Sequence, residues 1–182
     1  DWVIENKTVL LVASLLVTVT LASLIPRLTH NDKFLEYFDE RIDFRKATDW
    51  TSQNLSGVNV VNYSISSKGP GGISDPEYLS YLADYSSWLR DQPEVDHVAS
   101  FSDIMKRINK SMNGDLTEFY AVPSDRDLAA QYLLLYEMSL PYGLDLNNQI
   151  NVDKSSSRLL VTTQNLSTSE FARFQDKAWN WM

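Results

Sequence analysis

The chain has 182 residues, and its 24 acidic and 16 basic side chains give a formal net charge of −8. This negative balance argues against a nucleic-acid partner, because phosphate binding requires a basic face. The sequence contains no cysteine, which excludes disulfides, thiolate nucleophiles and cysteine-based zinc sites. With His30 and His97 as its two histidines, the chain has little scope for metal or triad chemistry, and no cofactor is expected.

A long apolar segment lies near the N-terminus. The nineteen residues between Lys7 and Arg27 carry no formal charge, and a helix of that length rises about 30 Å, the thickness of the hydrocarbon core of a bilayer. We therefore expect a transmembrane helix over residues 8–28, preceded by a cytoplasmic flank over residues 1–7. A signal peptide is the alternative, but the apolar run exceeds the usual length and no small-x-small cleavage site follows it.

Small side chains form a row along this segment. Ser14, Thr18 and Ala22 recur every four residues and share one helix face. Such a row lets a second membrane helix approach closely. Because these residue types are common in membrane helices in any case, the packing face and a featureless lipid-facing surface both remain open.

The next segments alternate between helical and strand patterns. Residues 29–57 are expected to form a linker and a lead-in helix, with the helix over residues 39–55. A strand then begins at residue 58 and places Val61, Tyr63 and Ile65 on one face. It opens the domain that we assign to residues 58–182.

A second helix and strand follow. The run Ser74-Asp75-Pro76 has the residues of a helix start, and the helix is expected to end before Pro93. A short strand over residues 95–101 comes next, with His97 as a surface residue. A strand, helix, strand order of this length suggests a parallel crossover.

The middle of the chain contains two helical patterns. Residues 102–112 carry a basic side with Lys106, Arg107 and Lys110, for which a solvated face is favoured over an anion site.

The second pattern is strongly apolar. Ser124 and Asp127 resemble a capping box at its start. Its wide apolar band favours a buried core helix, and a contact with a substrate or a neighbouring subdomain is the alternative. Leu133, Tyr136 and Tyr142 are the candidate residues for that contact.

The last segments are a strand and a well-marked helix. The strand begins at Arg158, and Ser167 with Glu170 predicts a capping box at the start of the helix. The order of elements predicts an α+β chain: an N-terminal transmembrane helix followed by a ferredoxin-like (split βαβ) domain with inserted helices. That domain would be incomplete at its C-terminal end, and a fourth strand is expected after Met182.

Catalytic motifs are absent from the sequence. No HExxH, GxSxG, GxxxxGK[ST] or GxGxxG arrangement occurs. Scattered carboxylates without a partner pattern usually lie on a solvated surface. The sequence therefore predicts no catalytic residue, and the protein is not expected to be an enzyme.

Several segments carry a family resemblance in order along the chain. They are IPRLTHNDKFLEYFDERIDFRKATDW, SDPEYLSYL with WLRDQPEVDHV, DIMKRINKSMNGD, and AAQYLLLYEMSLPYGLDLNNQINVDKSSSRLLV. Together they resemble the membrane helix and the following periplasmic porter domain of bacterial RND-superfamily exporters of the MMPL-type branch. The resemblance covers essentially all 182 residues and is greater to the second repeat of such a transporter than to the first.

The resemblance implies a multi-pass protein of the bacterial inner membrane that is driven by proton flow. Residues 58–182 would form part of a periplasmic porter domain that guides and gates amphiphilic, lipid-like or hydrophobic substrates. The implied partners are the lipid bilayer, the rest of the transporter with its second porter domain, the substrate, and a second copy of the chain in a homo-oligomer. The extracytoplasmic sensor domain of a membrane receptor and a membrane-anchored scaffold protein are the alternatives.

Overall fold

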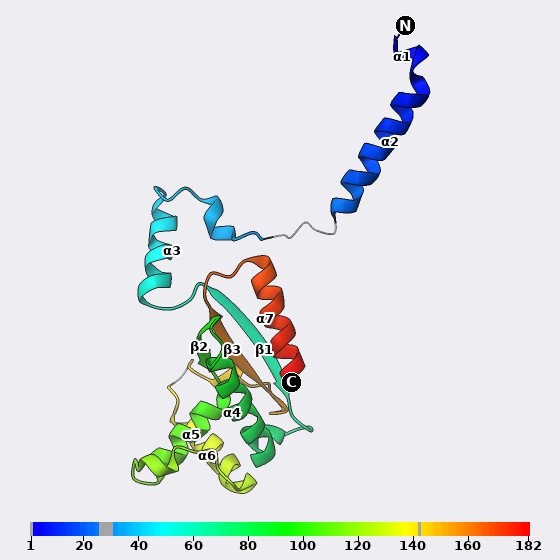
Figure 1. The fold of residues 1–182 in the computed structure, drawn as a ribbon. Helices are drawn as coiled ribbons and strands as arrows, with labels where there is room; N and C mark the ends of the chain where they lie inside the picture. Colours follow the sequence, from blue (N-terminus) through cyan, green and yellow to red (C-terminus); the bar gives the residue numbers. More distant parts are fainter. Residues whose placement is uncertain (1, 26–30, 142) are drawn as a thin grey trace.

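The computed structural model describes residues 2–25, 31–141 and 143–182. They form an N-terminal helical segment, a lead-in of short helices, and a body in which helices pack on a three-stranded sheet (Figure 1). This mixed composition of helices and sheet confirms the α+β class.

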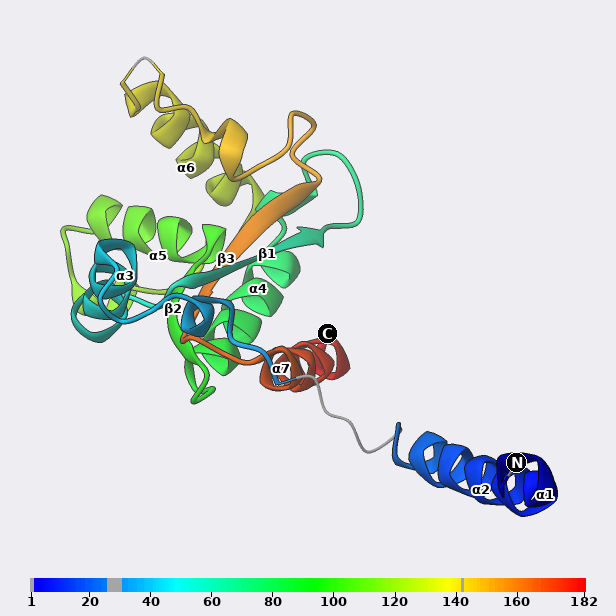
Figure 2. The same ribbon diagram turned by 90° about the horizontal axis from the view of Figure 1, so that it is seen from above.

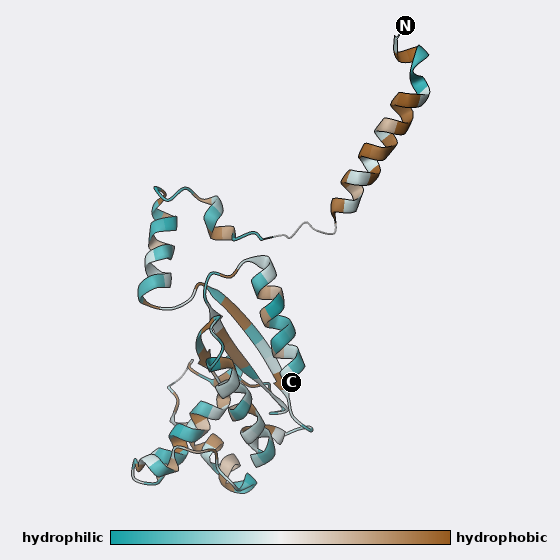
Figure 3. Cartoon of the chain, viewed as in Figure 1, coloured by the Kyte–Doolittle hydropathy of each residue, from teal (hydrophilic) through white to brown (hydrophobic). Residues whose placement is uncertain are grey.

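The N-terminal segment consists of α1 (Trp2–Glu5) and α2 (Lys7–Leu24). The uninterrupted run of Leu, Val, Ala, Ser and Thr forms α2, and none of its residues is buried. Figure 3 shows the apolar colouring continuing along α2. The predicted helix is therefore present from residue 7 to residue 24, whereas residues 26–28 of the predicted span, and His30, lie outside the described residues.

The lead-in contains η2 (Phe34–Tyr37) and α3 (Asp43–Asn54). The expected start of a helix at Asp39 is wrong. The Asp39 carboxylate accepts hydrogen bonds from the backbone N–H of Arg41 (2.8 Å) and from its guanidinium. A short acidic side chain bonded to nearby backbone stabilises a turn in place of a helix, and α3 begins four residues later.

The sheet consists of β1 (Asn59–Ser66), β3 (Ser156–Thr163) and β2 (Val95–Ala99), in that spatial order. The central strand β3 is antiparallel to both neighbours, so β1 and β2 run in the same direction without touching. The chain passes between them through α4 (Pro76–Arg90). The predicted alternation in β1 is confirmed, because Tyr63 and Ile65 are buried and Val60 is 54% exposed.

The core lies between one face of the sheet and the helices. These are α4, α5 (Phe101–Met112), α6 (Arg126–Ser139) and α7 (Thr168–Trp181) (Figures 1 and 2). Leu159 and Val161 of β3 are fully buried against them. The opposite sheet face is more open, since Arg158, Asn62 and Ser64 are exposed there.

Helix caps decide where the helices begin. Pro76 opens α4, and Ser167 and Glu170 form the predicted capping box of α7. The predicted box of Ser124 with Asp127 is wrong. Asp125 is the N-cap of α6, because its extended backbone lets its carboxylate accept the backbone N–H of Leu128 at 2.8 Å.

Candidate functional site

The hydroxyl groups in the row of small residues on α2 are bonded within the helix. The Ser14 hydroxyl donates to the carbonyl of Leu11 (2.9 Å), and the Thr18 hydroxyl donates to the carbonyl of Ser14 (2.8 Å). These polar groups are satisfied within the helix, and Ala22 is exposed beside them. The row is therefore free of polar groups that need another partner, and its role as a packing face stays a prediction.

The candidate contact residues on and after α6 occupy different environments. Leu133 is 2% exposed and belongs to the core together with Ala129 and Tyr132. Tyr136 is partly buried and packs against that core, while Tyr142 lies outside the described residues. The core-helix interpretation is confirmed for this side of α6. The side chain of Leu133 is consequently not accessible to a substrate, because it fills the interior of its own domain.

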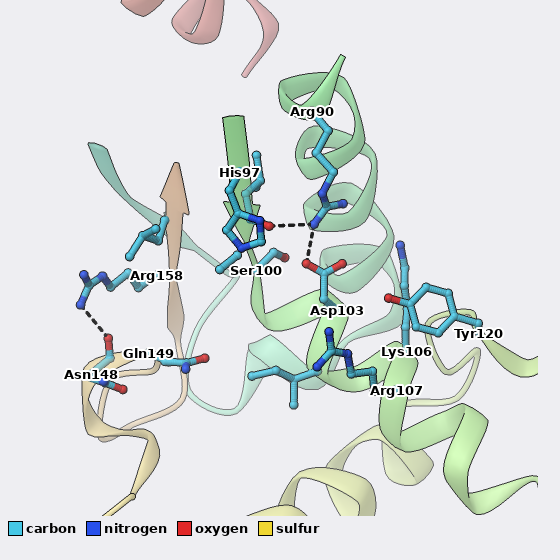
Figure 4. A pocket seen from close by; sticks show the side chains of 14 residues that line it. Arg90, His97, Ser100, Asp103, Lys106, Arg107, Tyr120, Asn148, Gln149 and Arg158 are labelled. Carbon is cyan, nitrogen blue, oxygen red and sulfur yellow. Dashed lines mark hydrogen bonds and ion pairs between the residues drawn. The ribbon is translucent and has the colours of Figure 1, made fainter. Parts of the chain in front are cut away.

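A cleft lies between α5 and the open edge of the sheet. It has a volume of about 670 Å³. One wall comes from α5, another from β2 and β3, and the loop around η5 (Leu146–Asn148) completes it (Figure 4). No segment taken alone contains this site, because β2 and α5 meet in it with the η5 loop and β3, which follow much later in the sequence.

Basic side chains outnumber carboxylates in the lining of the cleft. They are Arg90, Lys106, Arg107 and Arg158, and Asp103 is the one carboxylate among the lining residues. Figure 4 shows Lys106 and Arg107 on the α5 side and Arg158 on the opposite side. In a chain with a net charge of −8, this is a local concentration of positive charge.

The carboxylate of Asp103 is already engaged. Arg90 donates to it at 2.5 Å and to the carbonyl of Val98 at 3.1 Å, which ties α4 to β2 and α5. Arg158, in contrast, donates to two uncharged groups, the side-chain oxygen of Asn62 (2.7 Å) and the carbonyl of Asn148 (3.3 Å). Its guanidinium is thus oriented by neutral partners that do not cancel its charge.

Apolar side chains form the rest of the lining. Val98 is almost fully buried, and Leu160 and Ile104 are half-buried at the cleft surface. Leu160 lies at the centre of the sheet, opposite Asn62 on one side and Ala99 on the other. The cleft therefore combines positive charge with apolar surface.

The Ser100 hydroxyl, which is among the lining groups of the cleft, has a structural role. Ser100 caps α5: its Oγ accepts the backbone N–H of Ser102 at 3.1 Å and lies 2.6 Å from the Ser102 hydroxyl. No three His, Asp or Glu side chains gather into a possible metal site within residues 2–25, 31–141 and 143–182. The basic and apolar side chains that line the cleft make it suited to hold a ligand.

Sequence reasoning identified Lys106 and Arg107 but interpreted them as a solvated face. It missed Arg90 and Arg158, because each looks like an ordinary charged residue at the end of a helix or on a strand. No pattern in the sequence indicates that Arg90 and Arg158 lie in the same cleft. Comparison with known proteins finds no matching family model, no significantly similar curated protein and no significantly similar solved structure.

Proposed function

We propose that the chain is the membrane helix and part of the periplasmic porter domain of a proton-driven RND-type exporter of the bacterial inner membrane. The observation that carries this proposal is α2, an 18-residue helix of mean hydropathy 2.0 of which no part is buried. A helix whose apolar side chains find no core in its own domain needs lipid or other membrane helices around it. The resemblance of the sequence to MMPL-type exporters names the class.

The sheet supports the same proposal. Its two outer strands run in one direction, α4 connects them, and β3 lies between them in the opposite direction. A ferredoxin-like porter subdomain has this order with one more strand beside β1. In the proposed protein, that strand follows residue 182 and completes the sheet.

The proposed role is mechanical. The domain guides and gates amphiphilic, lipid-like or hydrophobic substrates by moving against a second porter domain, while the proton pathway belongs to other membrane helices. The Ser14, Thr18 and Ala22 row packs against one of these helices, and Tyr136 is the remaining described candidate on α6 for contact with a substrate or subdomain. No bond is made or broken in this part of the protein.

The topology can be tested directly because the sequence contains no cysteine. Single variants Glu5→Cys and Ser87→Cys place a thiol at exposed positions on either side of α2. In the full-length parent protein, with any cysteine outside residues 1–182 replaced by serine, a membrane-impermeant maleimide added to spheroplasts should label the thiol at position 87 and should reach position 5 only after lysis. Equal labelling of both positions in intact spheroplasts would contradict the proposal.

Export is tested in cells that carry or lack the parent gene. Efflux of Nile red should depend on the gene, stop on addition of a protonophore, and be lost when residues 31–182 are deleted. A sensor domain or a scaffold predicts that efflux depends neither on the gene nor on residues 31–182. A change in gene expression or the loss of a protein complex, with dye efflux intact, would therefore favour one of those alternatives.

A further inference from the structure

The cleft contains more basic side chains than carboxylates that could pair with them. Of its four basic residues, Arg90 is paired with Asp103, and within the described ranges the other three have no carboxylate partner in the cleft. A ligand that brings negative charge compensates this unpaired positive charge, and the guanidinium groups of Arg107 and Arg158 suit carboxylate or phosphate oxygens.

The apolar part of the lining indicates that the ligand is larger than an inorganic ion. Leu160 and Ile104 expose apolar surface beside the basic groups. The volume of about 670 Å³ lies in the range of sites that bury small organic molecules. A free phosphate would contact basic groups and leave Leu160 and Ile104 in water.

We propose that this cleft binds an amphiphilic anion, with a carboxylate or phosphate head held by Lys106 and Arg107 and an apolar body on Leu160 and Ile104. Binding is a property of this chain and goes beyond the proposed export function. Identifying such a molecule as the exported substrate is a separate step, and it rests on the proposed function.

A titration tests the proposal on the whole chain of residues 1–182 in nanodiscs of uncharged phosphatidylcholine. The probes are octyl phosphate, octanoate, inorganic phosphate and octyltrimethylammonium. NMR signals of the arginine side chains report binding at the cleft separately from probe that dissolves in the bilayer. The two octyl anions should give saturable shifts at Arg107, inorganic phosphate should bind at least about tenfold more weakly, and the cation should give no shift.

Charge variants locate the head of the ligand. Lys106→Gln combined with Arg107→Gln should weaken octyl phosphate binding by about tenfold. Lys110→Gln is the control, because it removes one positive charge from the same helix at a position outside the cleft, and it should leave the affinity unchanged.

An apolar variant locates the body of the ligand. Leu160→Asn should weaken binding of octyl phosphate and leave the affinity for inorganic phosphate unchanged. The remaining backbone signals show whether each variant is folded.

Three results would overturn the proposal: equal binding of the octyl anions and the octyl cation, binding of inorganic phosphate as tight as that of octyl phosphate, or unchanged affinity in the double charge variant. The titration involves neither transport nor topology, and the labelling of positions 5 and 87 involves no ligand. Failure of one proposal is therefore distinguishable from failure of the other.

Discussion

Two buried tyrosines show how much a single hydroxyl group contributes to the core. The Tyr78 hydroxyl donates to the carbonyl of Ile65 (2.9 Å) and lies 2.7 Å from the Ser157 hydroxyl. The buried Tyr63 hydroxyl has no hydrogen-bond partner in the described part of the chain. Each can be replaced by phenylalanine with little change in shape, so the pair isolates the effect of the hydrogen bonds.

Tyr78→Phe is expected to lower the free energy of unfolding by about 1–2 kcal/mol, because it leaves the Ser157 hydroxyl with one partner fewer in the interior. Tyr63→Phe should cause no loss, since it removes a buried polar atom without a partner. Urea unfolding followed by tryptophan fluorescence measures both. Equal losses in the two variants would mean that these hydroxyl groups do not differ in the way that the structure indicates.

These two tyrosines together with Tyr85 predict a loss of stability at alkaline pH. Burial raises the pKa of Tyr63, Tyr78 and Tyr85 above the ordinary value of 10.0, because the phenolate is poorly solvated in the core. Above pH 10 the unfolded chain releases these protons while the folded chain keeps them. Their contribution is fully present below pH 10 and is lost as the pH rises through the raised values.

Urea midpoints should therefore stay constant between pH 8 and 9 and fall by pH 11. Tyr63→Phe should reduce the fall, because one of the three groups no longer titrates. An equal fall in this variant and in the unaltered chain would assign the alkaline loss to other groups.

At the scale of the element, the start of α7 depends on a reciprocal pair of hydrogen bonds. The backbone N–H of Ser167 donates to the Glu170 carboxylate (2.9 Å), and the backbone N–H of Glu170 donates to the Ser167 hydroxyl (3.4 Å). Ser167→Ala should lower the free energy of unfolding by about 1 kcal/mol. Ser87→Ala, at an exposed position inside α4, is the control and should cause no loss, because alanine favours a helix interior. A loss in the control as large as that in Ser167→Ala would rule out a specific capping effect.

The sequence could predict those elements that depend on neighbours along the chain. The capping box of Ser167 and Glu170 involves residues within one turn, and the burial of Tyr63 and Ile65 follows from simple alternation in a strand. The predicted starts of α3 and α6 were wrong because a short acidic side chain, Asp39 or Asp125, accepts a hydrogen bond from a nearby backbone N–H. Asp125 is the N-cap of α6 in place of Ser124 for this reason.

Features that depend on distant segments could not be predicted. Gly57 lies shortly after the end of α3, where a glycine is common for local reasons. In the structure, a Cβ at this position would lie 2.0 Å from the carbonyl oxygen of Thr163. Close approach to β3 therefore explains why this residue is a glycine. The cleft has the same origin: Lys106 and Arg107 appear as a solvated face of one helix until the fold brings Arg158 to the other side.

At the scale of the whole molecule, α2 and the body differ in how much of their apolar surface is buried. The α+β body buries a core of leucines, tyrosines, phenylalanines and other apolar side chains between the sheet and four helices. The helix α2 buries none of its residues. Removing apolar surface from water is the main favourable contribution to folding, and the proposed membrane would supply for α2 the apolar environment that the body does not.

At one edge of the sheet, a strand has backbone groups without a partner strand in the described part of the chain. In the order β1-β3-β2, the outer side of β1 has no partner strand among the described residues. Alternate N–H groups of an edge strand point away from the sheet and are open to pairing. If a further strand follows residue 182 and completes a ferredoxin-like sheet, it should occupy this edge.

Amide hydrogen exchange tests this expectation at single residues. In the chain of residues 1–182, alternate amides between residues 59 and 66 should exchange fast, because water reaches them. In the parent protein the same amides should exchange at least about a hundredfold more slowly, since opening then requires separation of a paired strand. The amides of β3, which has partners on both sides, serve as the internal control and should be protected in both forms. Fast exchange of the β1 edge in the parent protein would mean that no strand is added there. The ferredoxin-like part of the proposal would then fail, whereas the membrane helix and the cleft are tested by their own experiments.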